Sequence, residues 1–221
     1  MTQNFTSDIS NFLLQSTIQE VVSPELNYSA DIERSFMFDL ESVNYLNKEF
    51  LIQNLSYNKT AKLLQAQLSE ETNKNNITQL INNLKGHFST LFFGKNSNYF
   101  ISDLILKATK NQKILILKEI QFHIYKMCFN EYASHPIQTL IEKASSKEEI
   151  DIILQEISSY KKFIKICVDP KGTYVIRKIL QCVSENFRLK INELIINNIN
   201  ILVADTNGVC IVVKYILSCE K

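Results

Sequence analysis

The sequence predicts an all-α protein, a solenoid in which three-helix units stack on one another. Of the 221 residues, 45% are apolar, enough for a large core, yet only four are glycine and three are proline. Because β-sandwiches and Gly-rich nucleotide folds need many tight turns, so few glycines and prolines favour helices. Residues 169–186 also recur in outline at residues 205–221, and such self-similarity is typical of repeat proteins.

The repeat can be followed through one position, the marker residue, which directly follows Gly172 or Gly208 and takes the same place in the other units. Successive marker residues are 50, 37, 36, 39 and 36 positions apart, and they are Asn11, Ala61, Asn98, Ser134, Thr173 and Val209. The longest interval contains the polar stretch VSPELNYSADIE, which predicts an inserted loop near residues 22–32. The spacing therefore predicts one repeat domain over residues 1–221.

Each marker residue lies near the start of an amphipathic helix, here called the marker helix. Apolar residues recur two, three, six and seven positions after the marker residue, as at Val175 and Ile176. They form the inner stripe of a helix, so the marker residue and the residue four positions later (marker +4) are expected on the exposed face. Asp169 and Asp205 are helix-start signals. The predicted marker helices lie near residues 8–20, 58–69, 95–107, 131–144, 170–183 and 206–219.

Two further helical patterns separate successive marker helices, for example EEIDIILQEISS followed by KKFIKICV. A unit is therefore three helices long. One unit cannot bury its apolar face alone, so the units must stack with every marker helix on the same side. The small residue before each marker residue, such as Gly172 or Ala133, indicates close approach by a neighbouring backbone.

Composition excludes several classes of protein. The net charge is only +1, although residues 1–60 carry −5 and residues 158–190 carry +6, a stretch that suits either a polyanion or solvent. Five cysteines without a CxxC pair indicate reduced, buried thiols in an intracellular protein. Neither a signal peptide nor a membrane span is recognised, so we expect no membrane association.

No motif for catalysis or for a metal is present, since HExxH, GxSxG, Gly-rich phosphate loops and paired cysteines are all missing. His87, His123 and His135 fall in different units, without a carboxylate at useful spacing. His123 and Cys128 lie on an apolar stretch and are interpreted as a buried structural pair. We therefore predict no enzymatic activity, no cofactor and no metal.

A repeat of about 36 residues with three helices, whose marker helix opens with D-x-x-G-x-x-hydrophobic-hydrophobic-x-K, resembles the Pumilio/PUF family of RNA-binding repeats. LKGHFSTLFF at residues 84–93 is similar to the first-helix segment of that family, and DIERSFMFDL to the link between its first two repeats. The resemblance covers the whole chain, with six units where the family usually has eight. It implies a curved right-handed solenoid of PUF repeats.

The resemblance also implies roles for single side chains. In the family, the marker residue and marker +4 read the edge of one RNA base, and the residue directly after the marker (marker +1) stacks on a base. The units that resemble readers of uracil, adenine and cytosine, in that order, are Asn11, Phe12 and Gln15; Ser134, His135 and Gln138; and Thr173, Tyr174 and Arg177.

Three units depart from this pattern. In one, Ala61 and Gln65 resemble an adenine reader, but Lys62 replaces the flat stacking residue. In the next, Ser102 is too short to reach a base edge securely. That unit has Asn98 as its marker residue and Tyr99 as its stacking residue. The last unit should be silent, because Val209, Cys210 and Val213 offer neither a hydrogen-bonding group nor a ring.

Since the family binds RNA antiparallel to the protein, the implied order from 5′ to 3′ is any base, C, A, U, A, U. Lys178 is a candidate phosphate contact, with a solvated lysine as the alternative. The implied function is sequence-selective binding of single-stranded RNA such as mRNA 3′ untranslated regions, in regulation of translation or decay. We expect a cytoplasmic monomer with protein effectors on its convex face. Two alternatives remain open, a nucleolar factor in ribosomal RNA processing and a protein-binding scaffold without RNA.

Overall fold

The computed structural model describes residues 48–182 and 185–219. The predicted helix near residues 8–20, the predicted loop near 22–32, and Asn11, Phe12 and Gln15 lie outside this part. Within the described residues all regular elements are helices, which confirms the all-α prediction. No described helix has both the length and the apolar character that crossing a membrane requires.

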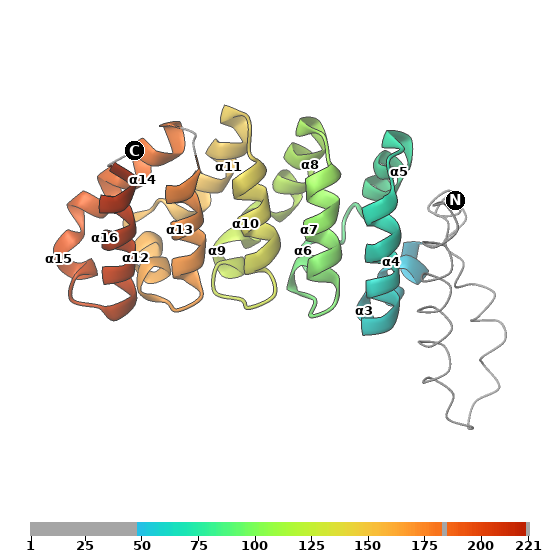
Figure 1. Ribbon diagram of the computed structural model, residues 1–221, viewed down its shortest axis with the longest axis horizontal. Coiled ribbons are helices and arrows are strands. Elements are labelled where there is room, and N and C mark those ends of the chain that lie inside the picture. The colour runs from blue at the N-terminus through green and yellow to red at the C-terminus, as the bar shows by residue number, and fades with distance from the viewer. Residues whose placement is uncertain (1–47, 183–184, 220–221) are drawn as a thin grey trace, which may run out of the picture. The chain divides into compact units, whose positions relative to one another are not determined.

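Five marker helices stand side by side in the order of the chain (Figure 1), and each contacts the next. They are α4 (Asn58–Glu70), α7 (Ser97–Lys107), α10 (Ser134–Lys143), α13 (Gly172–Gln181) and α16 (Thr206–Cys219). This arrangement confirms the predicted solenoid. The extent of the domain over residues 1–221 stays a prediction.

Two further rows of helices complete the units. The helices that follow the marker helices are α5 (Lys74–Leu84), α8 (Lys110–Ile120), α11 (Lys147–Ile157) and α14 (Glu185–Asn197), and α11 contacts both α8 and α14. A shorter helix precedes each marker helix. These short helices are α3 (Lys48–Ser56), α6 (Phe88–Phe93), the 3₁₀ helix η2 (Gln121–His123) with α9 (Ile124–Met127), α12 (Tyr160–Val168) and α15 (Ile199–Leu202). Each marker helix thus packs against the short helix of its own unit.

The predicted apolar stripe forms the core between neighbouring units. In α7, the four stripe residues are all buried, and the same holds for the equivalent residues in α13. They are Phe100, Ile101, Leu104 and Ile105 in α7, and Val175, Ile176, Ile179 and Leu180 in α13. Burying a large apolar side chain stabilises the folded state by about 1.5–3 kcal/mol, so this core is the main source of the free energy that holds neighbouring units together.

Two glycines allow the marker helix to lie directly against the short helix before it. A Cβ atom on Gly172 would lie 2.4 Å from the carbonyl oxygen of Ile166, and one on Gly208 would lie 2.3 Å from that of Leu202. The start of each helix is held by an aspartate, as Asp169 and Asp205 accept hydrogen bonds of 2.8 and 2.9 Å from the glycine N–H groups. The recurring glycine therefore serves packing.

A buried ion pair joins α8 to α11. Lys113 Nζ lies 3.0 Å from Glu149 Oε1, and the two side chains are only 7% and 1% exposed. The ammonium also donates to the Lys143 carbonyl, and Glu149 Oε2 accepts hydrogen bonds from the N–H and hydroxyl groups of Ser145 and Ser146. Burial opposes ionisation of Glu149, but these hydrogen bonds and the Lys113 charge outweigh it and lower the pKa of the carboxyl.

Two expectations about cysteine and histidine were wrong. His123 is exposed at η2 while Cys128 is fully buried, so they are no buried pair. Burial raises the pKa of the Cys128 thiol to about 12 and also raises that of Cys167, as expected for inert structural thiols. Cys210 and Cys219 on α16, however, are exposed, so they are not buried thiols.

Candidate nucleic-acid interface

A row of exposed side chains runs across the marker helices at marker +1. Tyr99 and Tyr174 are each 53% exposed. The full row is Lys62, Tyr99, His135, Tyr174 and Cys210, all of them exposed. Because the helices are stacked in order, the row offers one side chain per unit at regular intervals, as the sequence predicted for the stacking positions.

Two rings of this row already lie next to each other. The ring centroids of Tyr99 and His135 are 5.9 Å apart, with their planes tilted by 31°. A planar group between two rings needs roughly 7 Å, because each face-to-face contact of carbon atoms takes about 3.5 Å. The distance between the two ring centroids is thus shorter than a flat ligand between the rings would require.

The marker residues themselves are buried, which corrects the expectation that they share an exposed face with marker +4. Their exposed fractions are 3%, 0%, 6% and 5% for Ala61, Asn98, Ser134 and Thr173. The next marker helix packs over them, since Val209, with no described helix after it, is 39% exposed. At marker +4 the prediction of exposure is met only by Val213, because the other described side chains there are half-buried.

The polar marker residues hydrogen-bond to the chain just before their own helix. Thr173 Oγ1 donates to the Pro170 carbonyl at 3.3 Å, and Asn98 Nδ2 donates to the carbonyls of Gly94 and Lys95 at 2.9 and 2.8 Å. Asn98 Oδ1 is buried without a hydrogen-bond partner. An unsatisfied buried oxygen costs about 1–3 kcal/mol, so a donor that reached Asn98 would bind favourably.

The side chains at marker +4 are half-buried and point to different partners. Gln138 Nε2 donates to the Ser134 carbonyl at 3.1 Å, and Ser102 Oγ donates to the Asn98 carbonyl at 2.9 Å within its own helix. Gln65 Nε2 instead reaches Asp103 Oδ2 on α7, at 2.7 Å. Ser102 thus has no group that extends beyond its helix, as the sequence indicated.

In α13, the edge-reading and stacking candidates act together. The guanidinium carbon of Arg177 lies 5.7 Å from the centre of the Tyr174 ring, a distance at which a cation and an aromatic face attract each other. This contact orients Arg177 along the exposed row. A hollow between α13 and α16 lies beside Arg177, with Val209, Cys210, Val213, Lys214 and Leu217 as its other lining residues.

Lys178, the candidate phosphate contact, has a partner that the sequence analysis missed. Its Nζ lies 2.9 Å from Glu142 Oε2, on the neighbouring marker helix α10. Hydrogen bonds from Lys178 and Lys143 hold the pKa of Glu142 below its usual value. A phosphate would therefore compete with Glu142 for Lys178. The same sequence analysis also missed Asp103, because neither acid lies at marker, marker +1 or marker +4.

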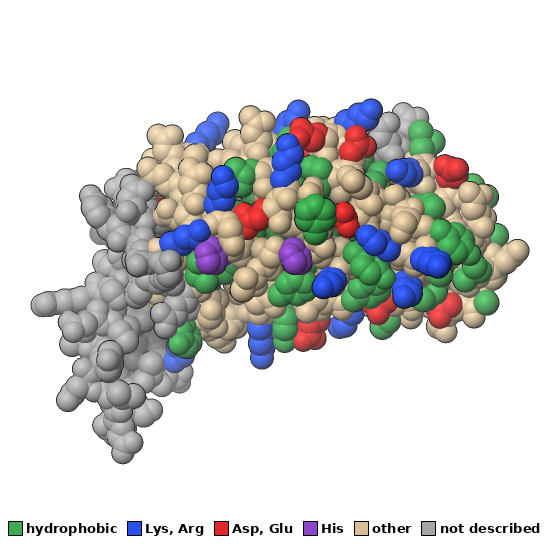
Figure 2. All heavy atoms as spheres, turned by 180° about the vertical axis from the view of Figure 1, so that it is seen from behind, with side chains coloured by type: hydrophobic (Ala, Val, Ile, Leu, Met, Phe, Trp, Pro, Cys, Tyr) green, Lys and Arg blue, Asp and Glu red, His purple; other side chains and the backbone are tan. Residues whose placement is uncertain are grey.

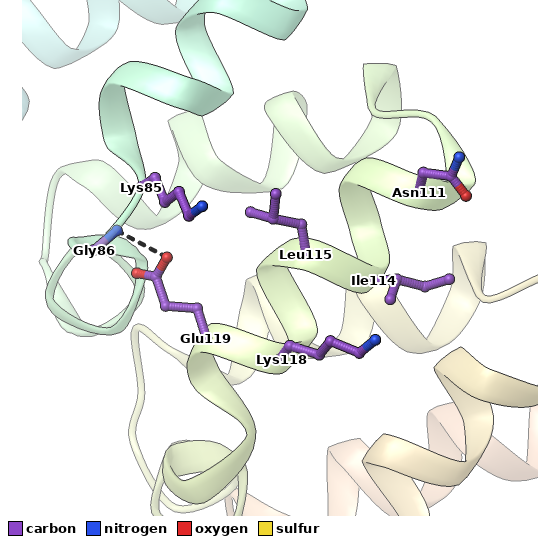
Figure 3. A pocket seen from close by; sticks show the side chains of 7 residues that line it. All are labelled: Lys85, Gly86, Asn111, Ile114, Leu115, Lys118 and Glu119. Carbon is purple, nitrogen blue, oxygen red and sulfur yellow. Dashed lines mark hydrogen bonds between the residues drawn. The ribbon is translucent and has the colours of Figure 1, made fainter.

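The face seen from behind carries charged side chains of both signs (Figure 2). Seen from behind, Lys and Arg side chains are interspersed with acidic and apolar ones over the described residues (Figure 2). A shallow hollow lies there between α8 and the turn before α6, lined by Lys85, Gly86, Asn111, Ile114, Leu115, Lys118 and Glu119 (Figure 3). The Glu119 carboxylate is occupied, since it accepts from the N–H groups of Gly86 and Phe88 at 2.8 Å each. Among the described residues no cluster of His, Cys, Asp and Glu could hold a metal ion.

These features define a class of protein, a helical-repeat protein with one exposed side chain per unit at marker +1 along a row of marker helices. The model of the Pumilio-family RNA binding repeat matches residues 123–158 and 162–191. This match covers 66 of the 221 residues, in the part of the chain where the sequence pattern resembles that repeat most clearly. Among the curated proteins, none matches the sequence.

Solved structures extend the PUF fold over most of the chain. The RNA-binding domain of yeast Puf5p bound to SMX2 RNA has a TM-score of 0.71 at 22% identity, over 85% of this chain and 52% of its own. The Puf4 RNA binding domain bound to the HO endonuclease RNA 3′ UTR recognition sequence has a TM-score of 0.68 at 21% identity, over 75% of this chain and 52% of its own. PUF-8 in complex with PBE-RNA has a TM-score of 0.61 at 14% identity, over 85% of this chain and 64% of its own. The chain thus spans about half the length of the Puf5p and Puf4 domains.

Proposed function

We propose that this chain binds single-stranded RNA along the marker helices and does so with sequence selectivity. The observation that carries the proposal is the exposed row at marker +1, where Tyr99, His135 and Tyr174 supply rings in three successive units. Base stacking on such rings contributes about 1–3 kcal/mol per base. The fold is shared with PUF domains that were solved with RNA bound, which supports the same ligand class here.

Selectivity would come from the groups beside the stacking row. Gln138 offers both a donor and an acceptor to a base edge, whereas Arg177 offers donors only. An RNA base with an acceptor-rich edge, such as cytosine, is the complement of Arg177. The unit of α16 supplies scaffold without base recognition, because Val209, Cys210 and Val213 carry no amide, carboxylate or ring.

The proposal is tested by selecting bound RNAs from a random pool, at several salt concentrations. A short enriched motif supports sequence-selective binding. Retention that is lost with rising salt and shows no motif would point to backbone contacts alone. No retention at moderate salt would contradict RNA binding altogether.

Changing Tyr174 to alanine is expected to weaken RNA binding by about ten- to a hundredfold, since one stacking contact of about 1–3 kcal/mol is removed. Binding is measured by fluorescence anisotropy with an RNA from the selected pool. Tyr160→Ala is the matched control, because Tyr160 is also exposed but lies on α12, outside the row. Both variants should keep the thermal stability of the wild type; a comparable loss of stability in Tyr174→Ala would make Tyr174 a packing residue.

Changing Arg177 to glutamine is expected to shift the selected motif at a single base, from cytosine toward adenine. The reason is that glutamine adds an acceptor where arginine has only donors. The measurement is a second pool selection with the variant. A motif that stays the same at every position would remove Arg177 from the set of base-reading residues.

In the cell we propose regulation of mRNA translation or decay, in the cytoplasm, by a monomer that binds 3′ untranslated regions without catalysis and holds protein effectors on its convex face. A nucleolar role in ribosomal RNA processing is the alternative for the weakly specified units, such as that of Ser102. A protein-binding role is favoured by one observation, the exposed apolar side chains of Val213, Ile216 and Leu217 on α16. Localisation by fluorescent tagging and sequencing of crosslinked RNA distinguish the first two, and failure to retain RNA supports the third.

A further inference from the structure

The hydrogen bond between Gln65 and Asp103 fixes the orientation of a base-reading amide. Gln65 lies on α4 and Asp103 on α7, and Nε2 of the amide is 2.7 Å from Oδ2 of the carboxylate. A carboxylate can only accept hydrogen bonds, so the NH₂ group must face Asp103 whichever way the amide is assigned. One N–H of the amide is thereby committed to Asp103, which leaves the acceptor Oε1 and the second N–H of Gln65 to face a ligand.

The position of Asp103 places its carboxylate beside the same ligand. Asp103 follows Tyr99 by four residues, so both side chains lie on one face of α7. A base stacked on the Tyr99 ring would therefore direct its edge toward the junction of α4 and α7. There it would meet two acceptors, Gln65 Oε1 and the lone pairs of the Asp103 carboxylate that do not accept from Gln65.

The other groups at this junction add no competing donor from the edge-reading positions. Ala61 is buried and has no polar side-chain atom. The Ser102 hydroxyl is committed to the Asn98 carbonyl of its own helix, at 2.9 Å. Lys62 is exposed at the stacking position, where its ammonium can lie along the base or reach a phosphate.

We propose that the junction of α4 and α7 selects guanine, with Asp103 as a specificity-determining residue. This assignment rests on the proposed RNA binding. Guanine presents two adjacent donors on its Watson–Crick edge, N1–H and the N2 amino group, and these complement two acceptors. Adenine, cytosine and uracil each place at least one acceptor among the corresponding edge atoms, which would face an oxygen. The assignment replaces the adenine that the sequence pattern implied for Gln65.

The register of the RNA can be fixed experimentally. The position of the selected motif at which the preferred base changes in the Arg177→Gln selection marks the base bound at α13. Because the units follow one another antiparallel to the RNA, the base at the α4–α7 junction lies three positions to the 3′ side of that position. We expect guanine there in the pool selected by the wild-type protein.

The test measures a ratio of affinities, which is independent of the general gain in RNA binding when a negative charge is removed. Four synthetic RNAs differ only at the junction base, which is guanine, inosine, adenine or cytosine, and their Kd values are measured by anisotropy. The wild type should bind guanine at least about tenfold tighter than adenine, and inosine, which lacks the N2 amino group, should lose most of that preference.

Asp103→Asn is the informative variant, because asparagine has the same shape but can present a donor and frees the Gln65 amide to turn. The preference for guanine over adenine should fall to less than about threefold. Asp151→Asn, at an exposed site on α11, removes the same charge elsewhere and should leave the ratio unchanged. Circular dichroism of both variants checks that the fold is kept.

The outcomes separate this assignment from the proposed function. The guanine assignment alone is overturned if the protein binds RNA but prefers adenine, or has no preference, at the junction. It is also overturned if Asp103→Asn keeps the base preference of the wild type. A protein that retains no RNA overturns both. Selection of guanine that is lost in Asp103→Asn and kept in Asp151→Asn supports both.

Discussion

Replacing Lys113 by alanine is expected to lower the free energy of unfolding by about 3–5 kcal/mol, the usual cost of leaving one charge of a buried ion pair unpaired. Glu149 would keep its hydrogen bonds to Ser145 and Ser146 but lose the ammonium that lies 3.0 Å from its Oε1. The measurement is urea unfolding followed by circular dichroism. Against a typical total stability of about 5–15 kcal/mol, a loss of this size is readily measured.

The same pair of helices supplies the control. Lys118 on α8 and Glu148 on α11 are 2.7 Å apart, but their side chains are 60% and 52% exposed. Solvent screens an exposed pair, so Lys118→Ala should cost less than about 1 kcal/mol. Equal losses in the two variants would contradict a special role for the buried pair. A double variant with Lys113→Met and Glu149→Leu should recover much of the loss, because the remaining buried charge is gone.

The sign of the pH dependence follows from the lowered pKa of Glu149. A carboxyl whose pKa is lower in the folded state stabilises the protein above its unfolded pKa, about 4.3, and this contribution is lost as the pH falls through the folded value. The difference in stability between the wild type and Glu149→Gln should therefore be full near pH 7 and shrink below about pH 4. A difference that grew in acid would contradict this reading of Glu149.

Replacing both Gly172 and Gly208 by alanine is expected to destabilise the solenoid, by about 1–3 kcal/mol for each site. Each new methyl group would meet a backbone carbonyl oxygen, at 2.4 Å in the first case and 2.3 Å in the second, and backbone cannot move aside as a flexible side chain can. The direction is opposite to the usual effect, because alanine in a helix normally stabilises by about 0.5–1 kcal/mol relative to glycine.

Thermal and urea unfolding of the two single variants and the double variant measure this effect. Lys171→Ala changes an exposed neighbour of Gly172 and should stay within about 0.5 kcal/mol of the wild type. A stabilising effect of alanine at Gly172 or Gly208 would show that the short and marker helices can separate without cost. The close approach would then be incidental to the stacking.

Much of the fold could be predicted because it repeats local rules. The spacing of marker residues, the apolar stripe at Val175 and Ile176, and the helix-start signal of Asp169 each depend on residues close in the sequence. The exposure of Tyr99 and Tyr174 followed from the same helical periodicity.

The candidate site could be predicted only in part. Periodicity places Asn98 and Thr173 at the edge of the stripe but does not say how far the next marker helix covers them, so their burial was missed. Asp103 and Glu142 were missed for a related reason. Their partners Gln65 and Lys178 are 38 and 36 residues away, on another unit, and their contacts depend on how neighbouring helices are offset.

The sequence by itself determined a helical solenoid, the positions of its marker helices within the described residues, and the row of side chains at marker +1. Those features arise from spacing along one helix, which the amino-acid order contains directly. Only the tertiary structure decided which polar atoms remain free for a base. One N–H of Gln65 is committed, because Asp103 approaches from the next helix once the two units are stacked.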